Sequence, residues 1–316
     1  MENIDSLKGI QRGMPAYRLS NANVFISPSG YHYIDYLDPV EHASPEENDE
    51  ASLTYEEILY IERLLQSHSE RFDNHVTIVK NHMSSIASRQ ILDIGCGGGL
   101  FLARLKHEGA VVRGIELSAS RAHYGRTKHD LDIVSRPIED PYWLSQSGVF
   151  DAITLWDVIE HVNYPLLTLE SAAKTLKTGG YIFIDTPCRD SFYHWFGECT
   201  YKVSNGKFPT FLNSMYSAQK FGHKQIFSTP EMKLLLENIG LEVVELRKFH
   251  ELSFPYRVYL GKMFKSNLLV ELLLPIVQSF LCLFPVKNKM LVIARKQDHK
   301  GDALKRCSSG WTDCDQ

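Results

Sequence analysis

The sequence predicts an α/β fold in which a largely parallel β-sheet is covered by helices on both faces. From residue 90 onward, short apolar runs typical of buried strands alternate with helical segments, and this alternation builds parallel sheets. The first run leads into four glycines within residues 95–99, and the second ends at Glu116. These three observations predict a doubly wound sheet with a ligand site at the carboxyl ends of its strands.

Seven strands and the helices between them follow from this pattern. We expect strands over 90–94, 111–116, 131–135, 150–155, 181–186, 241–249 and 289–295. We expect helices over 100–107, 118–128, 166–176 and 228–240. The helix over 166–176 is expected to end at Gly179 and Gly180, as helices often end at glycine. Two more helices should precede the first strand, one opened by a capping box of Thr54 and Glu57 and one over 76–86.

Composition excludes several classes of protein. The chain has 316 residues and a formal net charge of −4, from 34 basic and 38 acidic residues, so it offers no overall basic field and we expect no nucleic-acid partner. No two of the six cysteines have the CxxC spacing of a zinc or redox site, which favours a reducing compartment. Without a signal-peptide pattern in the first thirty residues, we expect a cytoplasmic protein.

The chain divides into a central domain with extensions. Residues 1–52 are expected to form an irregular extension that ends in an acidic linker over 41–52. Residues 53–296 form the main domain, and 297–316 a polar tail. Two insertions interrupt the alternation: an aromatic segment over 188–227, expected to cover the acceptor site, and a helical segment over 251–286.

The most apolar stretch, 268–284, lies in the second insertion. It is interrupted by Glu271, Pro275 and Gln278, whereas a membrane-spanning helix needs ~20 mostly apolar residues. We therefore expect no transmembrane segment and favour a pair of buried helices. Peripheral contact with a membrane through 264–286 is the alternative.

The glycine loop favours one ligand over another. A dinucleotide fingerprint requires a third glycine where this chain has Leu100. Asp93, beside the loop, would repel a pyrophosphate but suits the sulfonium and ammonium groups of S-adenosylmethionine. Glu116 ends the next strand, where a carboxylate can accept hydrogen bonds from ribose hydroxyls. The loop therefore predicts S-adenosylmethionine rather than a nicotinamide dinucleotide.

Four segments carry a resemblance to a known family. ILDIGCGGG (91–99), GIE (114–116), FDAITLWDVIEHV (150–162) and LKTGGYIFIDTP (176–187) resemble motifs of the class I S-adenosylmethionine-dependent methyltransferases. The chain is most similar to the group that contains the ubiquinone-biosynthesis O-methyltransferases, the methyltransferase type 11/23 group. The resemblance implies a Rossmann-like sheet of order 3-2-1-4-5-7-6 with strand 7 antiparallel. It also implies these cofactor-binding residues: Asp93, Gly95, Cys96, Gly97, Glu116, Leu117, Ile138, Leu155 and Trp156.

Candidate catalytic residues lie just beyond the fourth strand. Transfer to an alcohol or phenol requires loss of a proton, and histidine is the usual base near neutral pH. Asp157, Glu160 and His161 would share one face of a helical turn. The resemblance implies that ubiquinone-type relatives hold a divalent cation with this pattern. The alternative is that Glu160 and His161 only orient the cofactor loop, and we assign no metal. The resemblance also implies that His223 faces the acceptor.

The sequence thus predicts an S-adenosylmethionine-dependent methyltransferase that acts on an oxygen of a small-molecule, sugar or lipid-linked acceptor. Two alternatives remain, an N-methyltransferase and a non-catalytic regulatory subunit that binds S-adenosylmethionine. A nicotinamide-dependent reductase is disfavoured by Leu100 and Asp93. Some relatives begin with a cysteine-bearing zinc module, and because the segment 17–28 lacks cysteine we expect no zinc there.

Overall fold

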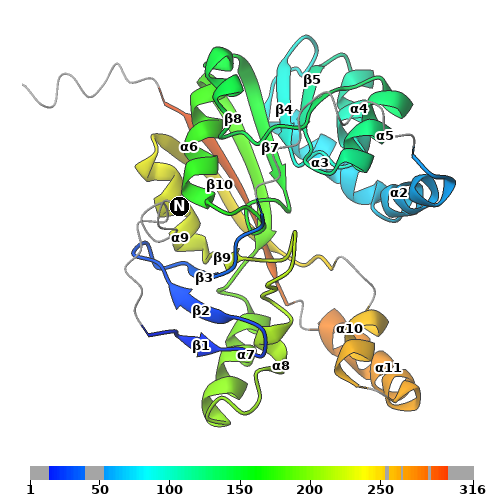
Figure 1. Ribbon diagram of the computed structural model, residues 1–316, viewed down its shortest axis with the longest axis vertical. Helices are drawn as coiled ribbons and strands as arrows, with labels where there is room; N and C mark the ends of the chain where they lie inside the picture. The colour runs from blue at the N-terminus through cyan, green and yellow to red at the C-terminus, as the bar shows by residue number, and fades with distance from the viewer. Residues whose placement is uncertain (1–13, 40–52, 253–255, 265, 284–285, 298–316) are drawn as a thin grey trace, which may run out of the picture.

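The computed structural model describes residues 14–39, 53–252, 256–264, 266–283 and 286–297. Its centre is a seven-stranded sheet of order β10-β11-β8-β7-β4-β5-β6 (Figure 1). Strands β4 to β8 pair in parallel, whereas β11 runs antiparallel to both β8 and β10. This is the expected order 3-2-1-4-5-7-6, with the last strand reversed. The predicted fold class is confirmed.

The bounds of the strands follow the apolar pattern closely. The central sheet contains β4 (Gln90–Ile94), β5 (Val111–Ile115), β6 (Asp132–Val134), β7 (Phe150–Trp156), β8 (Leu176–Pro187), β10 (Leu241–Phe249) and β11 (Lys289–Lys296). The helices of this domain are α2 (Tyr55–Ser67), α3 (Ser69–His82), α4 (Leu100–His107), α5 (Ala119–His129), the 3-10 helix η1 (Pro141–Gln146), α6 (Pro165–Thr175) and α9 (Thr229–Asn238).

The start of β8 differs from the prediction. We expected a glycine-terminated helix up to residue 176 and a strand from 181, but β8 already begins at Leu176. The pairing of β7 with β8 shifts register between Phe150 and Ala152, and this irregularity lets the longer strand continue past Gly179. The two glycines therefore lie within a strand rather than closing α6.

Neighbouring residues of each strand face two different cores. On one face, Ile91 and Phe183 pack with Val79 of α3 and with Leu102 of α4. On the other, Leu92 and Ile184 pack with side chains of α6, α9 and η1. Because side chains alternate along a strand, both faces are apolar and both are covered, as parallel sheets require.

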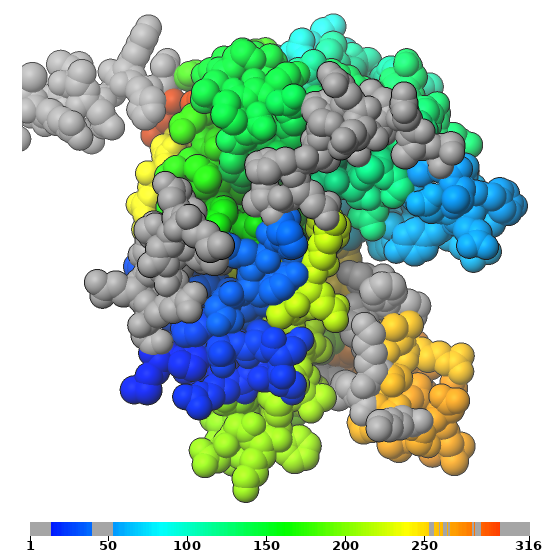
Figure 2. Space-filling view, viewed as in Figure 1, coloured from blue at the N-terminus to red at the C-terminus, as the bar shows by residue number. Residues whose placement is uncertain are grey.

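The N-terminal extension is more regular than expected. It forms β1 (Tyr17–Arg18), β2 (Asn23–Ile26) and β3 (His32–Ile34), which pair with β9 (Gln225–Ile226) of the aromatic insertion. Helices α7 (Phe192–Val203) and α8 (Thr210–Asn213) pack beside this small sheet (Figures 1 and 2). We call strands β1–β3 and β9 together with α7 and α8 the accessory module. The expected acidic linker over 41–52 lies entirely outside the described residues.

A buried polar group lies at the centre of the accessory module. The side chains of His32 and His194 are almost fully buried, and Nδ1 of His194 lies 3.4 Å from Oε1 of Glu198. The Tyr17 hydroxyl donates a hydrogen bond to the same carboxylate oxygen at 2.8 Å. These contacts tie the N-terminal strands to α7.

The second insertion forms the expected two helices, α10 (Tyr256–Met263) and α11 (Asn267–Leu283). The prediction that they are buried is wrong, because Leu268, Leu272 and Ile276 of α11 are 73%, 61% and 63% exposed. In the described part of the chain, no helix has the length and apolarity needed to cross a membrane. The polar tail beyond residue 297 lies outside the described residues.

Candidate cofactor and acceptor site

The glycine loop joins β4 to α4 at the carboxyl edge of the sheet. Gly95, Gly97 and Gly99 have φ angles of 75°, 57° and 81°, in the left-handed region that favours glycine. A Cβ at Gly95 would lie 2.6 Å from Val158, and one at Gly99 would lie 2.4 Å from Leu131. A Cβ at Gly97 would meet nothing within 4 Å. Packing therefore requires the first and third glycines, while Gly97 borders open space that a ligand can use.

Two acidic side chains lie beside this loop. The Glu116 carboxylate accepts hydrogen bonds from the backbone N–H groups of Gly97, at 2.8 Å, and Ser118, at 2.7 Å. Because a carboxylate has about four acceptor positions, it can still accept from hydroxyl groups of a ligand. Asp93 is buried at the end of β4, and the hydroxyl of Thr154 donates to it at 2.7 Å.

The protein surroundings disfavour negative charge on both acids. Burial, together with the nearby carboxylates of Glu116 and Asp185, raises the pKa of Asp93 to about 8. Burial also raises the pKa of Glu116, against the hydrogen bonds from Ser118 and Gly97 and the charge of Arg121. A cationic ligand beside these groups would favour their ionised forms. The residues present therefore fit S-adenosylmethionine, which carries a sulfonium and an ammonium group and no phosphate.

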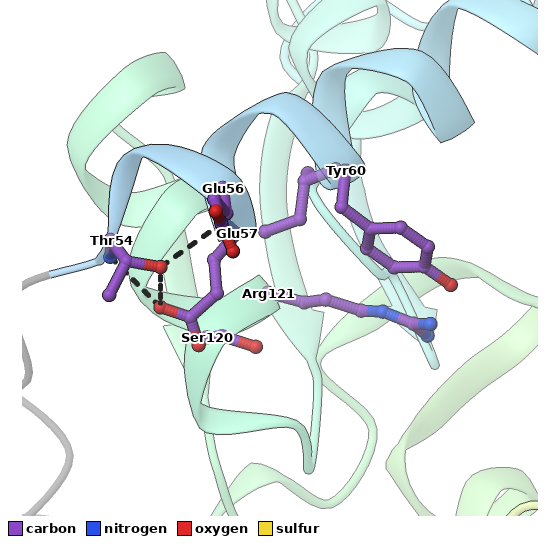
Figure 3. A pocket seen from close by; sticks show the side chains of 7 residues that line it. Thr54, Glu56, Glu57, Tyr60, Ser120 and Arg121 are labelled. Carbon is purple, nitrogen blue, oxygen red and sulfur yellow. Dashed lines mark hydrogen bonds between the residues drawn. The ribbon is translucent and has the colours of Figure 1, made fainter.

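A pocket of about 270 Å³ lies next to the loop, between α2 and the start of α5 (Figure 3). Its lining comprises Thr54, Glu56, Glu57, Tyr60, Ile61, Ser120 and Arg121. Thr54 and Glu57 form the predicted capping box, which fixes the start of α2. Further along α2, Ile61 and Leu65 contact the position that a Cβ of Gly98 would occupy. Helix α2 thus covers the glycine loop and forms one wall of the pocket.

The remaining expected cofactor residues differ in accessibility. Leu117 is 49% exposed, at the turn into α5. The Cys96 thiol lies against Gly114, where an added Cβ would meet its Sγ at 2.5 Å, and burial raises the pKa of the thiol well above the usual value. Ile138 and Leu155 are buried in the core, and Trp156 stacks on His75 with ring centroids 3.9 Å apart. Their predicted contacts with the cofactor stay predictions.

Asp157 does not join Glu160 and His161 on a helical turn, so that expectation is wrong. Residues 157–163 form turns and bends, and Asp157 has a φ of 53°. Its carboxylate pairs with Arg71 and lies 2.5 Å from Nζ of Lys289. Burial favours the neutral acid, but Lys289 and Arg71 hold the pKa of Asp157 below its usual range.

This carboxylate is part of a larger ion network at the edge of the sheet. Lys289 also contacts Asp185 at 3.0 Å and Glu251 at 2.9 Å. Arg71 contacts the same two acids, at 3.1 and 3.0 Å. We did not predict Arg71, Asp185, Glu251 or Lys289 as site residues, because they lie on α3, on β8, after β10 and on β11, with no shared local pattern.

Glu160 and His161, which follow β7, come together with His223, which precedes β9. Each offers a ligand-type atom, and these three atoms lie within 4.8 Å of one another. The rings of His161 and His223 have centroids 4.7 Å apart, and Nε2 of His161 lies 3.8 Å from Oε1 of Glu160. The Thr186 hydroxyl donates to the other oxygen of Glu160 at 2.9 Å, while Oε1 is buried without a partner. His223 therefore takes the place expected for Asp157.

Burial favours the neutral form of all three groups. It raises the pKa of Glu160 to about 7, with a further contribution from the charge of Asp157. It lowers the pKa of His161 and that of His223, so both imidazoles are neutral at pH 7. Nδ1 of His223 lies 3.2 Å from the Met215 carbonyl oxygen. Because a carbonyl only accepts, Nδ1 carries the proton and Nε2 is the basic nitrogen.

One buried lysine fixes the loop that carries His223. Lys224 is fully buried and donates to Asp38 and to the His161 carbonyl oxygen, both at 2.8 Å. The ion pair with Asp38 connects the N-terminal extension to the acceptor side of the site. Sequence reasoning also missed Lys224, although it directly follows His223 in the chain.

Comparisons with known proteins show what this chain is similar to. The family described as "Methyltransferase domain" matches residues 61–246, more than half of the chain. The ubiquinone biosynthesis O-methyltransferase of Photobacterium profundum is 26% identical over 63% of this chain and 81% of its own length. The mitochondrial ubiquinone biosynthesis O-methyltransferase of Candida albicans is 32% identical over 43% of each chain.

Solved structures show the same fold at low identity. A chain in the complex between the Haloferax volcanii Trm112 methyltransferase activator and a protein described as a methyltransferase superposes with a TM-score of 0.52. It is 14% identical, and the match covers 75% of this chain and 95% of that one. A Galdieria sulphuraria chain described as a sarcosine dimethylglycine methyltransferase gives 0.50 at 14% identity, over 74% and 88% of the two chains.

Proposed function

Because this chain belongs to the class I S-adenosylmethionine-dependent methyltransferases, we propose that it transfers the methyl group to an oxygen atom of a small-molecule, sugar or lipid-linked acceptor. S-adenosylmethionine supplies a methyl group that is already activated on a sulfonium. The observation that carries the choice of oxygen is the cluster of Glu160, His161 and His223 at the carboxyl edge of the sheet. A hydroxyl group must lose its proton during transfer, and this cluster can accept one.

The proposed roles follow from the contacts of each group. His223 presents Nε2 as the basic nitrogen because its Nδ1 is directed at a carbonyl oxygen. His161 is the second candidate base, beside the unpartnered Oε1 of Glu160. Glu160 stabilises the imidazolium that forms, since its other oxygen is held by Thr186. The relatives named as ubiquinone biosynthesis O-methyltransferases support oxygen as the acceptor atom.

The cofactor side of the site supports the same reaction. Gly97 leaves room at the loop, and Asp93 and Glu116 offer carboxylates to a cationic ligand with hydroxyl groups. Positioning contributes much of the catalysis in such a displacement, because the methyl donor needs no further activation. The chain's own residues therefore have two tasks: they orient the donor, and they remove the acceptor's proton.

A divalent cation in the same cluster is a variant of this proposal. Glu160, His161 and His223 form a set of one carboxylate and two neutral imidazoles, which suits several divalent metals. A cation there would bind the acceptor oxygen and lower its pKa. Activity that is lost with a chelator and restored by added metal favours the cation, whereas activity that survives chelation favours direct proton transfer to histidine.

Transfer of a labelled methyl group to matched acceptors tests the proposal. The panel pairs a catechol, a sugar alcohol and a polyprenyl-linked phenol with their amine counterparts, and product NMR distinguishes O-methyl from N-methyl groups. We expect product only on hydroxyl acceptors, with turnover that falls when the pH drops below the histidine pKa values. Methylation of the amines alone would favour the N-methyltransferase alternative.

A further inference from the structure

One face of α11 is apolar and has no partner among the described residues. Leu268, Leu272 and Ile276 are spaced by four residues, so they form a single stripe along the helix. They are 73%, 61% and 63% exposed, values far above those of ordinary core residues. Leu269, at 39% exposed, borders the same stripe. Isolated exposed leucines are common, but an ordered stripe of them marks an interaction surface.

The opposite face of α11 already has its partner. Val270 is 4% exposed and Leu260 of α10 is 7% exposed, and the two helices pack against each other. Figures 1 and 2 show this hairpin projecting from the rest of the molecule. The internal contact therefore accounts for one face only. Within the described part of the chain, nothing covers the stripe of Leu268, Leu272 and Ile276.

The charge balance of this part of the sequence indicates what covers the stripe. Between residues 256 and 287 the sequence has four basic residues, Arg257, Lys262, Lys265 and Lys287, and one acidic residue. That acid, Glu271, pairs with Arg257, so no free negative charge remains on α11. An apolar helix stripe in a segment whose sequence is net basic complements a bilayer with anionic headgroups, because apolar side chains enter the acyl boundary while cations favour the anionic surface.

The hairpin leaves the catalytic domain at the edge that carries the site. It lies between the end of β10 and the start of β11, and both points lie at the carboxyl edge of the sheet. Glu251 before the hairpin and Lys289 after it belong to the ion network with Arg71. A surface bound to the hairpin therefore lies on the same side of the molecule as the acceptor site.

We propose that the α10–α11 hairpin docks the enzyme on an anionic lipid bilayer through Leu268, Leu272 and Ile276. The docking itself does not depend on the acceptor, whereas its use in presenting a lipid-linked acceptor rests on the proposed function. A second copy of this chain is disfavoured as the occupant. Stable interfaces between proteins involve about 20–30 residues on each side, and the stripe supplies only a few.

Vesicle sedimentation with the full chain tests the docking without cofactor or acceptor. The probes are vesicles of phosphatidylcholine alone and vesicles with roughly a third of phosphatidylglycerol. We expect binding to the anionic vesicles that weakens with salt, and a loss of about tenfold or more in the partition coefficient for Leu272→Glu/Ile276→Glu. The matched control is Leu144→Glu, because Leu144 is 70% exposed on η1, away from the hairpin.

Separate readouts distinguish the possible failures. Circular dichroism and calorimetric affinity for S-adenosylmethionine establish that each variant is folded, and these do not depend on lipid. Equal vesicle binding by the wild type and the double variant would overturn the proposal, as would absence of binding by the wild type. Concentration-dependent dimerisation of the wild type that the double variant abolishes, without vesicle binding, would overturn it in favour of a second copy.

Discussion

At the scale of single residues, Gly97 is the loop residue that borders the open space proposed for S-adenosylmethionine. We expect Gly97→Arg to reduce affinity for S-adenosylmethionine at least ~100-fold, because the new side chain fills the space beside the loop. A loss of that size corresponds to only ~2.8 kcal/mol of binding free energy, at ~1.4 kcal/mol for each tenfold step. Calorimetric titration measures the loss. The matched control is Gly148→Arg, since Gly148 also has a positive φ of 66° and nothing within 4 Å of its added Cβ. Equal affinity in both variants would show that the loop is not part of the cofactor site.

Asp93 links cofactor binding to pH. Its pKa of about 8 in the protein means that the acid is mostly neutral at pH 7, whereas a cationic ligand favours the ionised form. Affinity for S-adenosylmethionine should therefore rise with pH and level off above about 8, with release of a proton on binding at neutral pH. Titrations in buffers with different protonation enthalpies measure the released proton. Asp93→Asn should weaken binding and abolish the dependence; a wild-type affinity that is constant with pH would contradict this assignment.

Variants of His161 and His223 should separate cofactor binding from methyl transfer. We expect His161→Ala and His223→Ala to leave affinity for S-adenosylmethionine nearly unchanged and to lower turnover on the true acceptor by about 10²–10⁴. Single-turnover transfer of a labelled methyl group measures the chemical step. The exposed His107→Ala is the control. Undiminished turnover in both active-site variants would make the two histidines structural.

At the scale of elements, the ion network holds α3, β8 and β11 together around the site. Lys289→Met removes the cation shared by Asp157 and Asp185 and leaves buried negative charge without a full complement of partners. We expect a loss of about 3–5 kcal/mol in the free energy of unfolding, measured with urea. Lys248→Met is the control, because its pair with Asp190 is partly accessible to solvent, unlike the buried network, and should cost ~1 kcal/mol or less. Similar losses in the two variants would show that the network is not a stabilising core.

The accessory module should make stability depend on pH. Burial lowers the pKa of His32 to about 3 and that of His194 to about 4, so the folded chain binds fewer protons than the unfolded chain below pH 6.5. Their stabilising contribution is complete above that pH and is lost as the pH falls toward the folded values. For His194 the loss between pH 6.5 and 5 is roughly 2 kcal/mol.

Unfolding measurements with His194→Gln test this dependence. The variant should show a shallower decline of stability between pH 6.5 and 5 than the wild type, since glutamine does not titrate. His107→Gln, at an exposed position, should retain the wild-type slope. If the slope of His194→Gln equals that of the wild type, the histidine is not buried in its neutral form.

Elements with a complete local pattern were predictable, and those completed by distant partners were not. Strands β4 and β10 and helix α4 have the predicted bounds because their own apolar spacing determines them. Strand β3 pairs with β9 from the far insertion, so its few residues show no pattern of their own. Asp157 was misplaced because its left-handed backbone conformation prevents the helical turn that its spacing suggested. Long-range pairing and single backbone torsions leave no periodic signal.

At the scale of the whole molecule, the parallel order of the strands determines where the site lies, because parallel strands end at the same edge of the sheet. The glycine loop, Glu116, the ion network and the Glu160 cluster all lie at the carboxyl edge of the central sheet. Sequence reasoning found this edge because parallel strands bring their ends together. It also expected the aromatic insertion to cover the acceptor site, but it could not foresee that the N-terminal strands and the hairpin would border the same edge, since their placement depends on contacts such as those of Lys224 and Lys289.

The most direct measurement is a calorimetric titration of the full chain with S-adenosylmethionine, S-adenosylhomocysteine and NADH. The glycine loop with its two carboxylates predicts micromolar binding of the first two ligands and none of NADH, whose pyrophosphate would meet Asp93 and Glu116. Binding of NADH, or failure of both sulfur ligands to bind, would contradict the assignment of this loop as the S-adenosylmethionine site.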